Sequence, residues 1–207
     1  MSRFSIWDIL LLPKGVYQRL TDNKLTLYLG ILFVGFVDVL FPLLTGEGLF
    51  YGKTQQSIIF NIVLACAFVV IIGLIDVISF SYPLFDFMKI IKKKPADVDS
   101  SRLVSKVMKI YITVHFIIIP FNLLFFYVVK SIQLETAPVF LQILLYLINS
   151  VVIPLWFTAA FFRGISTIFN LDPILRRFVF IAIFAWNYLL SYALDYIRIN
   201  WMMTLFK

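Results

Sequence analysis

Ionisable side chains interrupt two long apolar runs of this 207-residue chain. Asp38 lies in the hexamer GFVDVL at residues 35–40, and Asp76 lies in GLIDVI at residues 73–78. Charged groups inside a membrane are costly, and they mark proton relays, ion paths or paired groups. The single histidine, His115, is expected near the depth of Asp76, where the two side chains could form a proton relay, a structural ion pair or a hydrogen bond. The aspartates and the histidine are therefore candidates for a polar site inside the membrane.

Side-chain amides interrupt three apolar runs near their midpoints, at Asn122, Asn149 and Asn187. Amides at such positions join helices through hydrogen bonds or line a polar cavity, and both interpretations stay open. When the two runs are centred on the bilayer, a rise of 1.5 Å per residue places Asp38 and Asp76 at depths that differ by about 10–15 Å. This difference argues against a catalytic carboxylate pair. The repeated hexamer is then a coincidence or a shared helix-packing pattern, in which a small glycine lies beside bulky apolar residues.

Motifs that carry enzyme chemistry are missing from the sequence. It has no HExxH, GxSG or GxGD motif and no Walker A loop. Cys66 is the single cysteine, so no CxxC pair or intramolecular disulfide exists, and one histidine cannot hold a metal by itself. We therefore expect no enzymatic activity, no metal and no cofactor.

Composition indicates the elements that must hold these residues. Hydrophobic residues make up 62% of the chain and charged residues 14%, against about 45–50% and about 25% in soluble domains. One helical span needs roughly 20 apolar residues. The sequence therefore predicts an all-α polytopic membrane protein with five transmembrane helices, at Leu25–Leu44, Ile58–Phe80, Ile110–Val129, Val139–Phe162 and Phe178–Ile197.

Residues 1–24 precede the first predicted span and form a segment of their own. Their stretch SIWDILLLPKGVYQRL is amphipathic and too short to cross a membrane. Its apolar side chains share a rough helical face, which is formed by Ile6, Leu10, Pro13, Tyr17 and Leu20. This pattern predicts an interfacial amphipathic helix on the inner leaflet, or alternatively a partly buried lead-in to the first span. Residues 25–207 are then one transmembrane domain.

Basic residues predict the orientation and a binding face. Most of the 18 lysines and arginines fall on the side of the N-terminus and of the second and fourth connectors. The positive-inside rule therefore predicts a cytoplasmic N-terminus and an external C-terminus. Basic clusters beside a membrane bind anionic lipid headgroups or merely fix the topology. The candidates for headgroup or partner binding are Lys92, Lys93, Lys94, Arg102, Lys106 and Lys109.

Two stretches resemble bacterial members of the Yip1 family of five-span membrane proteins. LLLPKGVYQRL is similar to their proline-centred lead-in, and PLWFTAAFFRGISTIFNLDPILRRFVFIAIF to their passage from the fourth to the fifth span, with Trp156 inside the span and Arg163 at its inner end. The acidic tail and the DLYGP-like motif of the eukaryotic trafficking members are missing. The resemblance implies a bacterial cytoplasmic membrane protein that organises membranes or binds partners, and it supplies no catalytic residues.

Two functions follow from these patterns. The first is a non-enzymatic membrane scaffold, which binds lipid, a membrane-protein partner or a second copy of itself through its basic cytoplasmic face. The second is a small transporter or channel for protons, cations or a small solute, in which Asp38, Asp76 and His115 would work inside the membrane. No folded module indicates a nucleic-acid partner.

Overall fold

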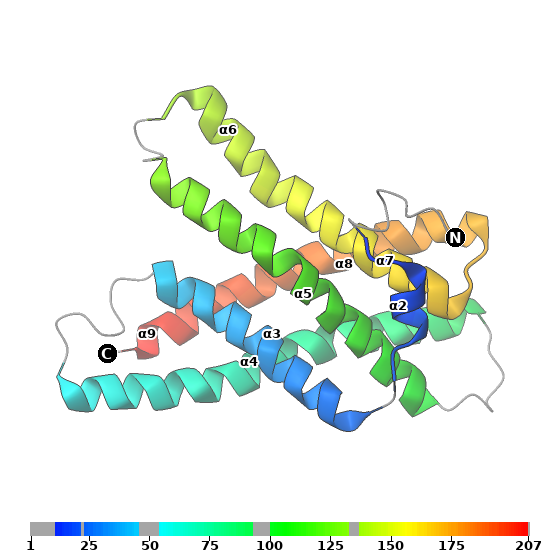
Figure 1. Cartoon of the computed structure of the whole chain (residues 1–207), viewed down its shortest axis with the longest axis horizontal. Helices are drawn as coiled ribbons and strands as arrows, with labels where there is room; N and C mark the ends of the chain where they lie inside the picture. Colours follow the sequence, from blue (N-terminus) through cyan, green and yellow to red (C-terminus); the bar gives the residue numbers. More distant parts are fainter. Residues whose placement is uncertain (1–10, 22, 46–53, 93–99, 133–136, 207) are drawn as a thin grey trace. The chain divides into compact units, whose positions relative to one another are not determined.

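The described part of the chain is helical. The computed structural model describes residues 11–21, 23–45, 54–92, 100–132 and 137–206, and no strand occurs within these ranges (Figure 1). The predicted all-α class is confirmed for these residues.

The helices follow one another with short connections. In chain order they are α2 (Lys14–Gln18), α3 (Lys24–Thr45), α4 (Gln55–Lys92), α5 (Ser100–Ser131), α6 (Val139–Leu147), the π-helical turn η1 (Ile148–Val152), α7 (Ile153–Phe169), α8 (Pro173–Ile197), the π-helical turn η2 (Arg198–Met202) and α9 (Met203–Leu205). Four runs of the described chain are long and apolar enough to cross a membrane, namely Gln55–Ile91, Ser100–Ser131, Val139–Phe169 and Pro173–Met202.

Four of the predicted spans lie inside these runs, and the helices extend beyond them. The helix α4 continues through Pro83 to Lys92, and α5 begins ten residues before the apolar run that predicted it. The first predicted span, Leu25–Leu44, falls within the 22-residue helix α3. That helix is not among the four runs, so the count of five spans stays a prediction.

The chain divides into two compact units. Unit 1 comprises Met1–Leu20 and Thr113–Asn187, and unit 2 comprises Thr21–Ile112 and Tyr188–Lys207. Unit 1 therefore contains α2, the later part of α5, the α6–α7 run and the start of α8. Unit 2 contains α3, α4, the start of α5 and the end of α8 with η2 and α9.

The two hexamers pack against each other in unit 2, where α3 crosses α4. A Cβ atom added to Gly35 would overlap the carbonyl oxygen of Val69 and lie 2.8 Å from the amide nitrogen of Gly73. A Cβ atom added to Gly73 would lie 2.9 Å from the amide nitrogen of Gly35. Only glycine allows the two backbones to approach this closely. The interpretation of the repeat as a helix-packing pattern is confirmed.

Replacement of Gly35 by alanine tests this crossing. We expect Gly35→Ala to lower the free energy of unfolding by about 1–3 kcal/mol, because the added methyl group forces two backbones apart. Thermal unfolding in detergent micelles, followed by helical circular dichroism, measures the change. Gly15→Ala is the matched control, since nothing lies within 4 Å of its added Cβ atom. Equal melting temperatures for the two variants would contradict the close crossing.

Candidate functional site: a basic pocket at the end of α7

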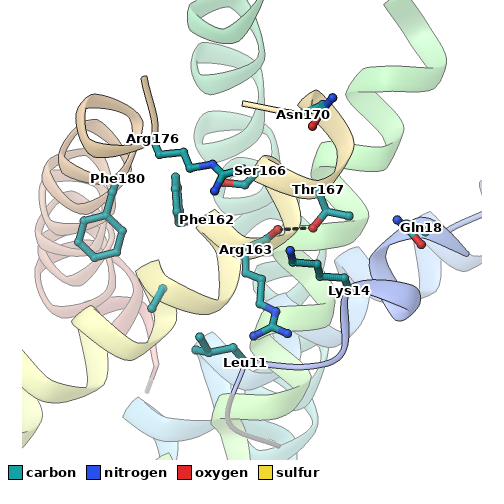
Figure 2. A pocket seen from close by; sticks show the side chains of 11 residues that line it. Leu11, Lys14, Gln18, Phe162, Arg163, Ser166, Thr167, Asn170, Arg176 and Phe180 are labelled. Atoms are coloured by element: carbon teal, nitrogen blue, oxygen red, sulfur yellow. Dashed lines mark hydrogen bonds between the residues drawn. The ribbon is translucent and has the colours of Figure 1, made fainter. Parts of the chain in front are cut away.

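A cavity of about 770 Å³ lies in unit 1, between the lead-in segment, the end of α7 and the start of α8 (Figure 2). Its lining carries three cations, Lys14, Arg163 and Arg176. None of the described residues that line it is acidic. We call this cavity the basic pocket.

The helix α7 supplies one wall of the basic pocket. Arg163, Ser166, Thr167 and Asn170 line it together because spacings of three and four residues place side chains on one face of a helix. The helix ends at Phe169, and the C-cap residue Asn170 has a φ of 47°, which is left-handed. Asparagine adopts this conformation more readily than most residues. The polar stripe therefore runs to the last turn of α7 and stops at the chain reversal.

The reversal after α7 brings Arg176 to the same cavity. Leu171 is 2% exposed and anchors the turn, and Pro173 begins α8, a position that suits its fixed φ. The Nε–H of Arg176 donates to the carbonyl oxygen of Leu171 at 3.0 Å. This hydrogen bond orients the guanidinium of Arg176, which lines the cavity.

Tyr17 attaches the lead-in segment to α7 within unit 1. Its side chain is 1% exposed, and its hydroxyl donates to the carbonyl oxygens of Ala160 and Leu11, each at 3.0 Å. Burial raises the pKa of Tyr17, and the nearby Arg163 guanidinium opposes that rise. The contact agrees with a partly buried lead-in. The surface helix predicted over residues 1–24 stays a prediction, because residues 1–10 lie outside the described ranges.

Two hydroxyl groups in the basic pocket differ in what they can offer a ligand. The hydroxyl of Thr167 donates to the carbonyl oxygen of Arg163 at 2.7 Å, so its proton is already used. The Oγ of Ser166 is buried and has no hydrogen-bond partner among the described residues. A buried hydroxyl without a partner is destabilising. An anion in the pocket would accept a hydrogen bond from it.

Unit 2 contains a separate buried polar cluster around Asp76. Asp76 is 2% exposed, and its carboxylate accepts a hydrogen bond of 2.7 Å from the hydroxyl of Tyr111. The ring of Tyr111 stacks on Phe80 with the centroids 4.2 Å apart. The side chains of Asp38 and Arg198 also lie near the Asp76 carboxylate. Asp76 is therefore held by neighbours from several helical segments.

Arg198 joins this cluster to the more exposed carboxylate of Asp195. Its Nη1 lies 3.7 Å from Oδ1 of Asp38 and donates to the backbone carbonyl oxygen of Asp38 at 3.3 Å. Its other terminal nitrogen pairs with Asp195. The expected separation of Asp38 from Asp76 was wrong. Asp38 and Asp76 each follow a glycine of the crossing by three residues, Gly35 and Gly73 respectively. Both carboxylates therefore lie near the crossing of α3 and α4.

The other predicted intramembrane residues lie in unit 1. The half-buried ring of His115 meets the ring of Phe157 edge to face at 5.0 Å, and the pairing of His115 with Asp76 stays a prediction. The three asparagines have different surroundings, since Asn187 is buried, Asn122 is half-buried and Asn149 is exposed. Their predicted roles as helix contacts or cavity lining remain open.

The predicted basic connector is described only in part. Lys92 ends α4, and Lys93 and Lys94 lie outside the described ranges. Arg102 is exposed and Lys106 is half-buried.

Lys109, the last of the predicted connector residues, is 6% exposed. Its ammonium donates to the carbonyl oxygens of Thr21 and Asn23, the latter at 2.7 Å. Lys109 therefore stabilises the segment before α3, and its role in headgroup or partner binding stays a prediction.

The sequence prediction did not include the basic pocket. One signal was available, because Arg163, Ser166, Thr167 and Asn170 follow the helical period close to two further arginines. The described residues contain no group of three or more His, Cys, Asp or Glu side chains that could hold a metal ion.

Comparisons of the chain with models of protein families, with curated proteins and with solved structures found no match. The resemblance to the Yip1 family stays a prediction.

Loss of the Tyr17 hydroxyl tests the attachment of the lead-in. We expect Tyr17→Phe to lower the free energy of unfolding by about 1–3 kcal/mol, since the hydrogen bond that the hydroxyl shares between two carbonyl oxygens is lost. The control is Tyr28→Phe, because Tyr28 is 59% exposed. Chemical denaturation in micelles measures both.

The same variant has an expected pH dependence. Tyr17 keeps its proton in the folded protein above pH 10.0, its ordinary pKa, while the unfolded chain loses it. The stability that Tyr17 contributes is therefore full below pH 10 and falls above it. The wild type should lose stability more steeply than Tyr17→Phe above that pH, and parallel curves would contradict the burial of the hydroxyl.

Proposed function

We propose that this chain is a non-enzymatic integral membrane protein with five membrane-spanning helices, which binds anionic lipid headgroups at its cytoplasmic face. The observation that carries the proposal is the basic pocket, in which Lys14, Arg163 and Arg176 surround one cavity without an acidic side chain among its described lining. Cations of one sign repel one another at close range. An anion that binds between them relieves this repulsion.

The membrane part of the proposal rests on helix length. Four described runs are long and apolar enough to cross a bilayer. The helix α3 has 22 residues, a length of about 33 Å, which matches the hydrocarbon core of a bilayer. Five spans with the predicted orientation would put the lead-in and the turn between α7 and α8 on the cytoplasmic side. The contact of Tyr17 with Ala160 supports a shared side for these two segments.

Apolar side chains favour a lipid over a small hydrophilic anion. Leu11, Phe162 and Phe180 line the basic pocket beside its cations, and the two phenylalanine rings meet edge to face at 5.6 Å. A headgroup could contact the cations while the upper part of an acyl chain lies against the rings. Each basic residue near an anionic lipid contributes about 1 kcal/mol.

Substitution of the exposed cations tests headgroup binding. We expect Lys14→Gln and Arg176→Gln each to reduce the retention of phosphatidylglycerol relative to phosphatidylcholine about fivefold, the equivalent of about 1 kcal/mol. Native mass spectrometry of the full chain released from micelles measures the retained lipid. Both residues are exposed, so folding should be preserved.

Arg177→Gln is the matched control, because it removes the same charge from an exposed neighbour of Arg176 that does not line the pocket. Equal retention in all variants would contradict the proposal. A loss caused only by replacing Lys92, Lys93 and Lys94 would place the binding on the connector instead.

The buried cluster of unit 2 supports a second candidate function, the transport of protons or cations. Ionisable residues inside membrane proteins commonly belong to proton relays or ion paths. Here Asp76 is almost fully buried. Charged side chains continue from it through Asp38 and Arg198 to the exposed Asp195. Such a series of groups could connect a buried carboxylate to solvent.

Flux into liposomes tests the second candidate. We expect wild-type protein to conduct protons or cations and Asp76→Asn to abolish the flux, because the amide keeps the shape of the side chain without its titratable proton. Circular dichroism of the reconstituted variant checks that it folds. Asp86→Asn, which removes an exposed carboxylate from the same helix, is the control. A well-folded wild type without flux would eliminate the transport role.

A further inference from the structure

The crossing of α3 and α4 in unit 2 brings two carboxyl groups together. Gly35 and Gly73 allow the two backbones to approach closely. Asp38 and Asp76 each follow one of these glycines by three residues, almost one helical turn. A hydrogen bond joins the side chains of Asp38 and Asp76. Two carboxyl groups form such a bond only when one of them is protonated, because an ionised carboxylate is solely an acceptor.

The pair is shielded from solvent. Asp76 is 2% exposed, and the Oδ2 atom of Asp38 is buried. Two negative charges at hydrogen-bonding distance repel each other strongly where water does not screen them. Two carboxyl groups that share such a site therefore hold one proton between them.

The nearby cation does not balance both negative charges. Arg198 lies near both carboxyl groups, with its Nη1 atom 3.7 Å from Oδ1 of Asp38. It also pairs with Asp195, so one positive charge is divided among three carboxyl groups. The hydroxyl of Tyr111 donates to Asp76 at 2.7 Å but adds no charge. A proton on the pair removes one of the negative charges that Arg198 leaves unbalanced.

We propose that Asp38 and Asp76 form a proton-binding site, in which the two carboxyl groups share one proton. The proton lies between an oxygen of one carboxyl group and an oxygen of the other. The Tyr111 hydroxyl and the Arg198 guanidinium stabilise the single negative charge that remains. The assignment of this proton as a transported ion rests on the second candidate function above, and it names the ion.

A proton suits this position better than a metal cation. The guanidinium of Arg198 lies beside both carboxyl groups and repels a second positive ion. The carboxyl groups also already hydrogen-bond to each other and to Tyr111. A metal cation takes at least about four ligands, whereas a shared proton needs only two oxygen atoms.

An amide reproduces a protonated state of the pair. Asparagine in place of either aspartate keeps a hydrogen-bond donor at the contact but has no titratable proton. In Asp38→Asn and in Asp76→Asn, the remaining carboxyl group accepts a hydrogen bond from the new amide and is ionised near Arg198. Both variants should therefore fold without a protonated carboxyl group at the crossing.

Infrared spectroscopy of the full chain in phosphatidylcholine vesicles detects the shared proton, because a protonated carboxyl group has a carbonyl stretching band that an ionised carboxylate lacks. We expect this band in the wild type at neutral pH, and we expect its loss in Asp38→Asn and in Asp76→Asn. Asp86→Asn is the matched control, since it removes an exposed carboxylate from α4 and should keep the band. Circular dichroism verifies that each variant folds.

A second variant decides the matter where an asparagine variant does not fold. Tyr111→Phe removes the hydrogen bond to Asp76 and should shift the band of the wild type. A band that Tyr111→Phe leaves in place would overturn the proton site. A wild-type spectrum without the band would also overturn it, as would a band that persists in either folded asparagine variant.

Flux into the same vesicles separates this inference from the transport function. The band without any ion flux would support the proton site and eliminate transport. Sodium or potassium flux without the band would leave transport intact and overturn the proton site. The band together with proton flux that Asp76→Asn abolishes would support both.

Discussion

The destabilising effect of a buried polar group without a partner is the constraint on which this structure depends. A hydrophobic residue fraction of 62% leaves little solvent inside the helical units, and polar groups in such surroundings need partners from the protein. Asp76 has the hydroxyl of Tyr111, Lys109 has two backbone carbonyl groups, and Arg198 lies near Asp38. Each of these contacts joins segments that are distant in the sequence, so the polar groups specify which helical faces meet.

The basic pocket departs from this rule in an informative way. The buried Asp76 carboxylate faces a hydroxyl, and the buried Lys109 ammonium faces carbonyl groups. At the end of α7, three cations face one cavity, and the nearby hydroxyl of Ser166 has no described partner. The Ser166 hydroxyl can therefore still donate to a ligand. Such a local departure is therefore more informative about function than the contact of Asp76 with Tyr111, which packing alone can explain.

The sequence predicts the helices well because long apolar runs have few alternatives to a helix in a membrane. It also predicts the packing of the two hexamers, since a glycine beside bulky apolar residues is typical of close helix contacts. It does not predict which side chain a polar residue meets. The structure shows a donor to Asp76 that no sequence pattern selected, Tyr111, which lies one helical turn before His115 in α5. Periodicity identifies a face of a helix, and only the three-dimensional arrangement identifies what lies opposite.

The basic pocket illustrates the same limit. Its α7 residues could be recognised by their helical spacing, but Lys14 belongs to α2, a helix of five residues. So short a helix is not stable by itself, because its nucleation is unfavourable. Tertiary contacts must hold it, and the Tyr17 hydroxyl supplies two of them at 3.0 Å. The position of Lys14 at the pocket therefore depends on a tyrosine that never faces the cavity, a dependence that no local pattern in the sequence reveals.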